Sequence, residues 1–198
     1  MTKRTLATGA ALLLTFGLAA CGGGEPAPEA EAPEAAPPAA APPPAAGGMP
    51  SWFQVEGNNV TMDIVAGATP DANHWNFNGA TNGAMTITVP EGAQVTINFR
   101  NADPAMAHSL GISAFTATPA AAPAAEPAFP GAISADPTSM TASTLTGESE
   151  TIMFTASTAG EYVLTCYIPG HAISGMWVRF NVGGEAGVTG APNVQLPM

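Results

Sequence analysis

CYIPGHAISGMW, residues 166–177, carries a thiol, an imidazole and a thioether at five-residue intervals, at Cys166, His171 and Met176. Pro169 and Gly170 supply the turn that swings His171 back toward Cys166. Taken singly, each residue has an ordinary interpretation, because a lone cysteine is most often a buried thiol and a methionine often fills core space. Their joint spacing after a predicted strand, in a chain with one further cysteine at position 21, indicates a metal site.

The donor types indicate which metal. A cysteine thiolate, two imidazoles and a weak axial thioether form the trigonal site that copper prefers in electron-transfer proteins. The second imidazole must come from elsewhere, and His108 is the natural donor because it opens a predicted strand. We therefore expect one copper ion (Cu⁺/Cu²⁺) at His108, Cys166, His171 and Met176. Zinc is a poor fit, since a thioether would replace a harder donor.

The chain from about residue 49 has short runs rich in Val, Ile, Thr and Phe, separated by Gly, Pro, Asn and Asp, which is typical of an all-β domain. Alternation is clear at Val95, Ile97 and Phe99, so one face of that strand meets a core. We expect a Greek-key β-sandwich over 49–198, with a long Ala/Pro-rich surface excursion at 115–147 pinned by Phe129. The expected strands span 60–65, 84–89, 94–100, 108–112, 150–156, 161–166 and 176–182.

The N-terminus has the features of an export signal. Lys3 and Arg4 precede an apolar stretch that is too short to span a bilayer comfortably, and small residues lead to Cys21. We interpret 1–20 as a signal peptide and Cys21 as a lipidated anchor; an ordinary cleaved signal with an incidental cysteine is the alternative. The Ala/Pro/Glu-rich segment within 21–48 has nothing to bury and is interpreted as a disordered linker.

The charge balance excludes one class of partner. Fifteen acidic residues stand against four basic ones, a formal net charge of -11. Nucleic-acid binding needs clustered Lys and Arg, so we expect none. The sequence thus predicts an exported protein of the cell envelope or periplasm, held at the membrane by lipid and monomeric.

Several segments resemble one family. The ligand loop resembles those of cupredoxins and is similar to the loops of sulfocyanin and rusticyanin, and HWNFNG at 74–79, TITVPEG at 86–92 and VTINF at 95–99 resemble sulfocyanin upstream. The resemblance covers roughly 73–183. It implies a cupredoxin fold and copper ligands at His108, Cys166, His171 and Met176. After the first ligand histidine sulfocyanins usually have Asn, whereas this chain has Ser109, as rusticyanin does. This difference leaves the ligand set intact.

The resemblance implies a blue copper electron carrier rather than an enzyme, passing electrons to a cytochrome or terminal oxidase. Three strong ligands and an axial thioether leave no position for substrate, which disfavours hydrolytic chemistry. A copper carrier that delivers metal to an oxidase remains the alternative. The family also implies a surface-near His171 within an apolar docking patch of Ile168, Pro169, Gly170, Ala172 and Ile173.

Four further residues have roles outside the ligand set. Ser109 either hydrogen-bonds to the Cys166 loop or binds water. Asp103, with Asn101, is interpreted as shaping the turn before His108, and His74 as a surface or capping residue.

Overall fold

A computed structural model describes residues 49–197, which fold into two β-sheets. The predicted signal peptide, the Cys21 anchor and the linker up to residue 48 lie outside the described residues. Within 49–197, no helix is long and apolar enough to cross a membrane. The strands are β1 (Phe53–Glu56), β2 (Asn59–Ala66), β3 (Thr86–Val89), β4 (Gln94–Asn101), β5 (Gly111–Ala114), β6 (Ser149–Thr155), β7 (Gly160–Thr165), β8 (Trp177–Val182) and β9 (Gly187–Thr189).

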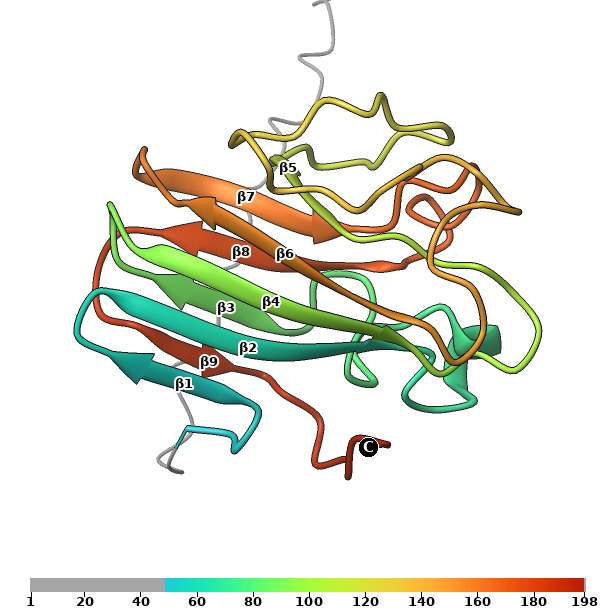
Figure 1. The fold of residues 1–198 in the computed structure, drawn as a ribbon, viewed down its shortest axis with the longest axis horizontal. Coiled ribbons are helices and arrows are strands. Elements are labelled where there is room, and N and C mark those ends of the chain that lie inside the picture. Colours follow the sequence, from blue (N-terminus) through green and yellow to red (C-terminus); the bar gives the residue numbers. More distant parts are fainter. Residues whose placement is uncertain (1–48, 198) are drawn as a thin grey trace, which may run out of the picture. The chain divides into compact units, whose positions relative to one another are not determined.

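The two sheets confirm the predicted all-β sandwich (Figure 1). One sheet has the order β1-β2-β4-β6 and the other β5-β7-β8-β3-β9. Two of the pairs, β2 with β4 and β3 with β8, are parallel, because the chain passes to the other sheet between them. The segment after β4 and the loop between β7 and β8 lie at the same end of the sandwich, on the right in Figure 1.

Strict alternation in the central strands explains the core. In β4 the side chains of Val95, Ile97 and Phe99 are buried, while intervening residues are more exposed. The same period puts Val178 and Phe180 of β8 into the same core cluster. Each CH₂ group removed from water contributes about 0.8 kcal/mol to the stability of the fold. A shift of register would move these side chains out of the core, so the core fixes the register of both sheets and holds their connecting loops.

Two strands were not predicted, and one of the predicted strands begins three residues later than expected; the other predicted strands differ by one or two residues at their ends. β1 and β9 were not predicted, because four and three residues are too short for alternation to be recognised. The expected strand at 108–112 begins only at Gly111, where β5 starts to pair with Thr165 of β7. His108 instead forms an isolated bridge to Thr144. It therefore lies just outside the sheet, in the loop that precedes it.

The excursion at 115–147 contains no helix or strand, yet it is not wholly a surface segment. Phe129 is buried and stacks on Phe154 of β6, with ring centroids 5.6 Å apart, as its predicted pinning role requires. Ala132 is also buried, and its carbonyl accepts the Ile112 N–H of β5 at 2.9 Å. Backbone pairing therefore makes part of the excursion a cover for the edge of the second sheet.

Candidate metal centre

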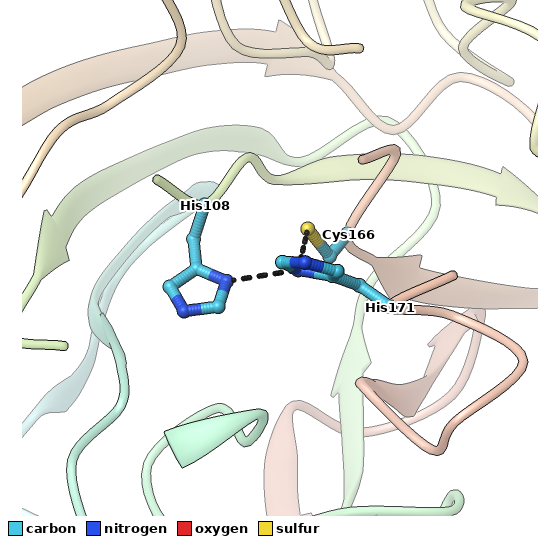
Figure 2. A group of neighbouring side chains, drawn as sticks. All are labelled: His108, Cys166 and His171. Carbon is cyan, nitrogen blue, oxygen red and sulfur yellow. Dashed lines mark hydrogen bonds between the residues drawn. The ribbon is translucent and has the colours of Figure 1, made fainter. Parts of the chain in front are cut away.

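Three of the four predicted ligands meet in the buried interior. One ligand atom each of His108, Cys166 and His171 lies within 4.8 Å of the other two (Figure 2). Nδ1 of His171 is 3.2 Å from Nδ1 of His108 and 3.5 Å from Sγ of Cys166. The segment before β5 and the loop between β7 and β8 thus bring together residues 58 and 63 positions apart, as the sequence analysis predicted.

The spacing of these atoms fits a trigonal metal site. Donors bound at 120° to a first-row metal with bonds of about 2.0–2.3 Å lie about 3.5 Å apart. The two pairs that include His171 lie 3.2 and 3.5 Å apart, and the His108–Cys166 pair lies within 4.8 Å. Two imidazoles and a thiol are soft to intermediate donors, and their trigonal arrangement suits copper. The residues present therefore fit one copper ion.

Asp103 fixes which nitrogen of His108 is free. Its Oδ2 lies 2.8 Å from Nε2 of His108, and both side chains are buried. Burial lowers the pKa of His108 more than the adjacent carboxylate raises it, so the ring is neutral. A neutral ring that donates Nε2–H to Asp103 keeps its lone pair on Nδ1, the atom that faces Cys166 and His171.

The carboxylate is itself held by a network. Oδ1 of Asp103 accepts the N–H groups of Ala105 and Met106, and the Asp103 N–H donates to the side chain of Asn101. Burial alone would raise the pKa of Asp103, but the N–H of Ala105 together with His108 holds it below its ordinary value. Asp103 and Asn101 do shape the turn, as predicted, and Asp103 also orients a ligand.

Of the two roles left open for Ser109, the structure shows the contact with the Cys166 loop. Its N–H donates to Sγ of Cys166 at 3.4 Å, and its Oγ lies 3.5 Å from the same sulfur. That Oγ also accepts the Tyr167 N–H at 2.8 Å, so its own hydrogen is free to point at the sulfur. Burial raises the pKa of the Cys166 thiol, and the Ser109 hydrogen bonds oppose that rise. Metal binding must therefore displace the thiol proton.

His171 is more deeply buried than the sequence predicts, with only 2% of its surface exposed. The indole of Trp75 stacks on its ring, with centroids 4.3 Å apart and planes 20° apart. Burial, and then the nearby His108, lower the pKa of His171 to about 4, so this ring is also neutral near pH 7.

The predicted docking patch is wrong at two positions. Ile168 and Ala172 have 0% and 1% of their surface exposed, because both pack inward beneath the ligand loop. Pro169 and Ile173 are exposed, and Gly170 is partly exposed. The Gly170 N–H donates to Ala121 of the excursion at 2.7 Å, so that segment borders the surviving part of the patch.

Met176 closes the ligand loop. Its N–H donates to the His171 carbonyl at 3.0 Å, and its carbonyl accepts the Cys166 N–H at 3.2 Å. The side chain is fully buried. These bonds hold the loop shut around the two ligands, and the axial role of the thioether stays a prediction.

Two residues of the site were missed from the sequence. The role of Asp103 as a His108 partner had a signal, since an acidic residue five positions before a predicted ligand stands in an apolar segment. Trp75 had none, because its contact with His171 joins residues 96 positions apart. His74, its neighbour, is half-buried and ends the short 3₁₀ turn η1 (Asp71–His74), outside the three-residue cluster.

Fold and centre together define a β-sandwich with a buried His₂Cys metal site. Residues 50–191 match the family described as the sulfocyanin (SoxE) domain, and the chain belongs to that family. The predicted resemblance to sulfocyanin is thereby confirmed.

Individual relatives can be compared with the chain. The sulfocyanin of Sulfolobus acidocaldarius is 28% identical over 120 residues, 60% of each chain, so the match spans less than two thirds of that relative's length. Auracyanin of Roseiflexus castenholzii is 27% identical with a TM-score of 0.43, over 63% of this chain and 97% of that one. Rusticyanin of Thiobacillus ferrooxidans is 27% identical with a TM-score of 0.42, over 66% and 86%.

Proposed function

We propose that this protein is a membrane-tethered, mononuclear type 1 copper protein that shuttles single electrons between respiratory redox partners. The observation that carries the proposal is the convergence of His108, Cys166 and His171 inside a sandwich of the sulfocyanin family. A copper ion bound there supplies one-electron chemistry by alternating between Cu⁺ and Cu²⁺. The sulfocyanin relative supports the same assignment.

Burial of the ligands supports electron transfer over the other chemistries. The exposed fractions of His108, Cys166 and His171 are 0%, 0% and 2%, so no substrate reaches them and water is excluded. A carrier that hands copper to another protein needs accessible ligands, which this burial does not favour. Backbone hydrogen bonds between Cys166, His171 and Met176 keep the ligand positions fixed. Fixed ligands suit repeated electron transfer without rearrangement.

The setting of the protein completes the proposal. We place it in the cell envelope or periplasm, exported by its signal peptide, anchored by lipid at Cys21 and acting as a monomer. A cytochrome or terminal oxidase is the proposed redox partner. The net charge of -11 supports a basic partner face and argues against nucleic acid.

The test is the visible and electron-paramagnetic-resonance spectrum of the purified chain after one equivalent of Cu²⁺, with Cys166→Ser as the control. We expect an intense thiolate-to-copper band that ascorbate bleaches reversibly and that the control lacks. A colourless chain that binds Cu⁺ and yields it to a chelator would overturn the proposal in favour of the copper carrier.

A further inference from the structure

Trp75 stacks on His171 and is the more exposed residue of the two. Trp75 as a residue is partly exposed, although Nε1 of its indole is buried, whereas His171 is 2% exposed. The two rings stack with centroids 4.3 Å apart and planes 20° apart, so their π systems are in van der Waals contact. Of these two residues, Trp75 is the one with surface that a partner can contact.

The chain presents Trp75 through an unusual turn. Ala72, Asn73 and His74 have φ angles of 51°, 56° and 63°, three consecutive non-glycine residues in the left-handed region. Such a backbone conformation is strained for a residue with a side chain and persists only where the surroundings impose it. The Trp75 N–H bonds the Ala72 carbonyl at 3.0 Å, which closes the turn directly before the indole.

The residue after Trp75 anchors the turn from the other side. Asn76 is fully buried, and its amide donates to the carbonyls of Thr69 and Asp71 at 2.9 and 3.2 Å. Its side-chain oxygen accepts the Gly79 N–H at 3.0 Å. The backbone on both sides of Trp75 is therefore fixed, and the indole has a defined place over His171.

We propose that Trp75 is the electron-entry contact of the site, an inference that rests on the proposed function. A reduced one-electron donor of protein size contacts the indole, and its electron crosses the stacked rings to the His171 side of the centre. The donor loses one electron and the copper centre gains one; no bond breaks and no proton moves. Electronic coupling falls steeply with each gap between orbitals, and the stack closes the gap that burial of His171 creates.

The proposal distinguishes Trp75 from Ile173, the exposed residue of the ligand loop. Ile173 has 51% of its surface exposed and lies two positions after His171, which makes it the obvious alternative contact. An aliphatic side chain offers apolar area but no π system against the ligand. We expect Ile173→Asp to affect partner association and Trp75 variants to affect transfer itself.

The experiment uses stopped-flow oxidation of reduced cytochrome c, a basic one-electron donor, by the oxidised copper-loaded chain. Trp75→Leu and Trp75→Met remove the π system, Trp75→Phe retains one, and Met153→Thr changes an exposed β6 residue as the control. At saturating donor we expect the Leu and Met variants to transfer at least tenfold more slowly, and Phe and the control within threefold. The visible spectrum and the reduction potential of each variant are measured as well. They show whether the copper centre has changed, and they allow the transfer rates to be compared at equal driving force.

A second readout needs no metal. In the metal-free chain, the indole ring current shifts the His171 ring-proton resonances upfield in the NMR spectrum. We expect Trp75→Leu to abolish that shift and Trp75→Phe to keep part of it. The inference about Trp75 would be overturned, and the proposed function left standing, by either of two results. One is a wild-type His171 ring-proton resonance without the upfield shift, and the other is a wild-type transfer rate in both the Leu and Met variants. A wild-type chain without a reducible copper band would remove the proposed function and this inference together.

Discussion

Replacing Asp103 by Asn should raise the reduction potential of the centre. The Asp103 carboxylate is buried, carries a pKa held below its ordinary value and bonds Nε2 of His108 at 2.8 Å. A negative charge there stabilises the more positive oxidation state of a metal held at Nδ1 of the same ring. Removing the charge favours the reduced state, and the potential rises.

The geometry gives the size of the effect. The 2.8 Å hydrogen bond and the width of the His108 ring together place the Asp103 charge roughly 6 Å from the point where the donor atoms meet. At that distance its interaction with a unit charge is about 3 kcal/mol at an effective dielectric constant of about 20. For a one-electron couple, about 1.4 kcal/mol corresponds to about 59 mV. Asp103→Asn is therefore expected to raise the potential by roughly 100 mV.

Cyclic voltammetry at pH 7 measures this shift, and the chain offers a matched control. Asp63→Asn on β2 removes the same formal charge from an exposed position, where solvent and salt screen it. We expect that control to stay close to the wild-type potential. An Asp103→Asn potential equal to the control, or lower than the wild type, would refute the electrostatic role of Asp103.

Three further outcomes follow from the structure. Burial lowers the pKa of His171 to about 4, so between about pH 6.5 and 4 the unfolded chain binds a proton that the folded metal-free chain does not bind. The free energy of unfolding should therefore fall by up to about 3 kcal/mol as the pH drops through this range. A urea midpoint that is the same at both pH values contradicts this. Ser109→Ala removes a hydrogen-bonding group from Sγ of Cys166 and an acceptor from the Tyr167 N–H, so the reduction potential should fall and the free energy of unfolding should drop by about 1–3 kcal/mol. Voltammetry measures the first effect and thermal melting the second. An unchanged potential would mean that the Ser109 hydroxyl does not act on the thiolate. Phe129→Ala should cost about 3–5 kcal/mol in urea unfolding while the copper band stays in place, and a loss below about 1 kcal/mol would mean that the excursion is not pinned there.

The sequence predicted the parts of this protein that depend on local pattern. Alternating residues such as Val95 and Ile97 located β4, and the spacing of Cys166, His171 and Met176 located the loop whose first two members join His108. The two-residue alternation of a strand and the ligand spacing of a short loop can each be recognised within about a dozen residues. They can be interpreted without knowing what packs against them.

What the sequence could not predict depends on pairing over long distances. The first residue of β5 is set by its pairing with Thr165 and by the bridge from His108 to Thr144, neither of which is near it in sequence. Burial of Ile168 and Ala172 was likewise missed, because apolar residues in a loop are equally compatible with a surface patch and with packing inward. Such choices are made by the assembled sandwich.

The two imidazoles of the centre have opposite surroundings, and this asymmetry separates two properties of an electron carrier. His108 bonds a buried carboxylate on its far side, which sets the charge felt at the donors. His171 stacks on the neutral indole of Trp75, the residue that we propose as the contact for a partner. Asp103 and Trp75 reach the centre through different ligands from different segments of the chain. Potential and transfer rate are thus adjustable at separate residues, while Cys166 and its Ser109 hydrogen bonds stay common to both.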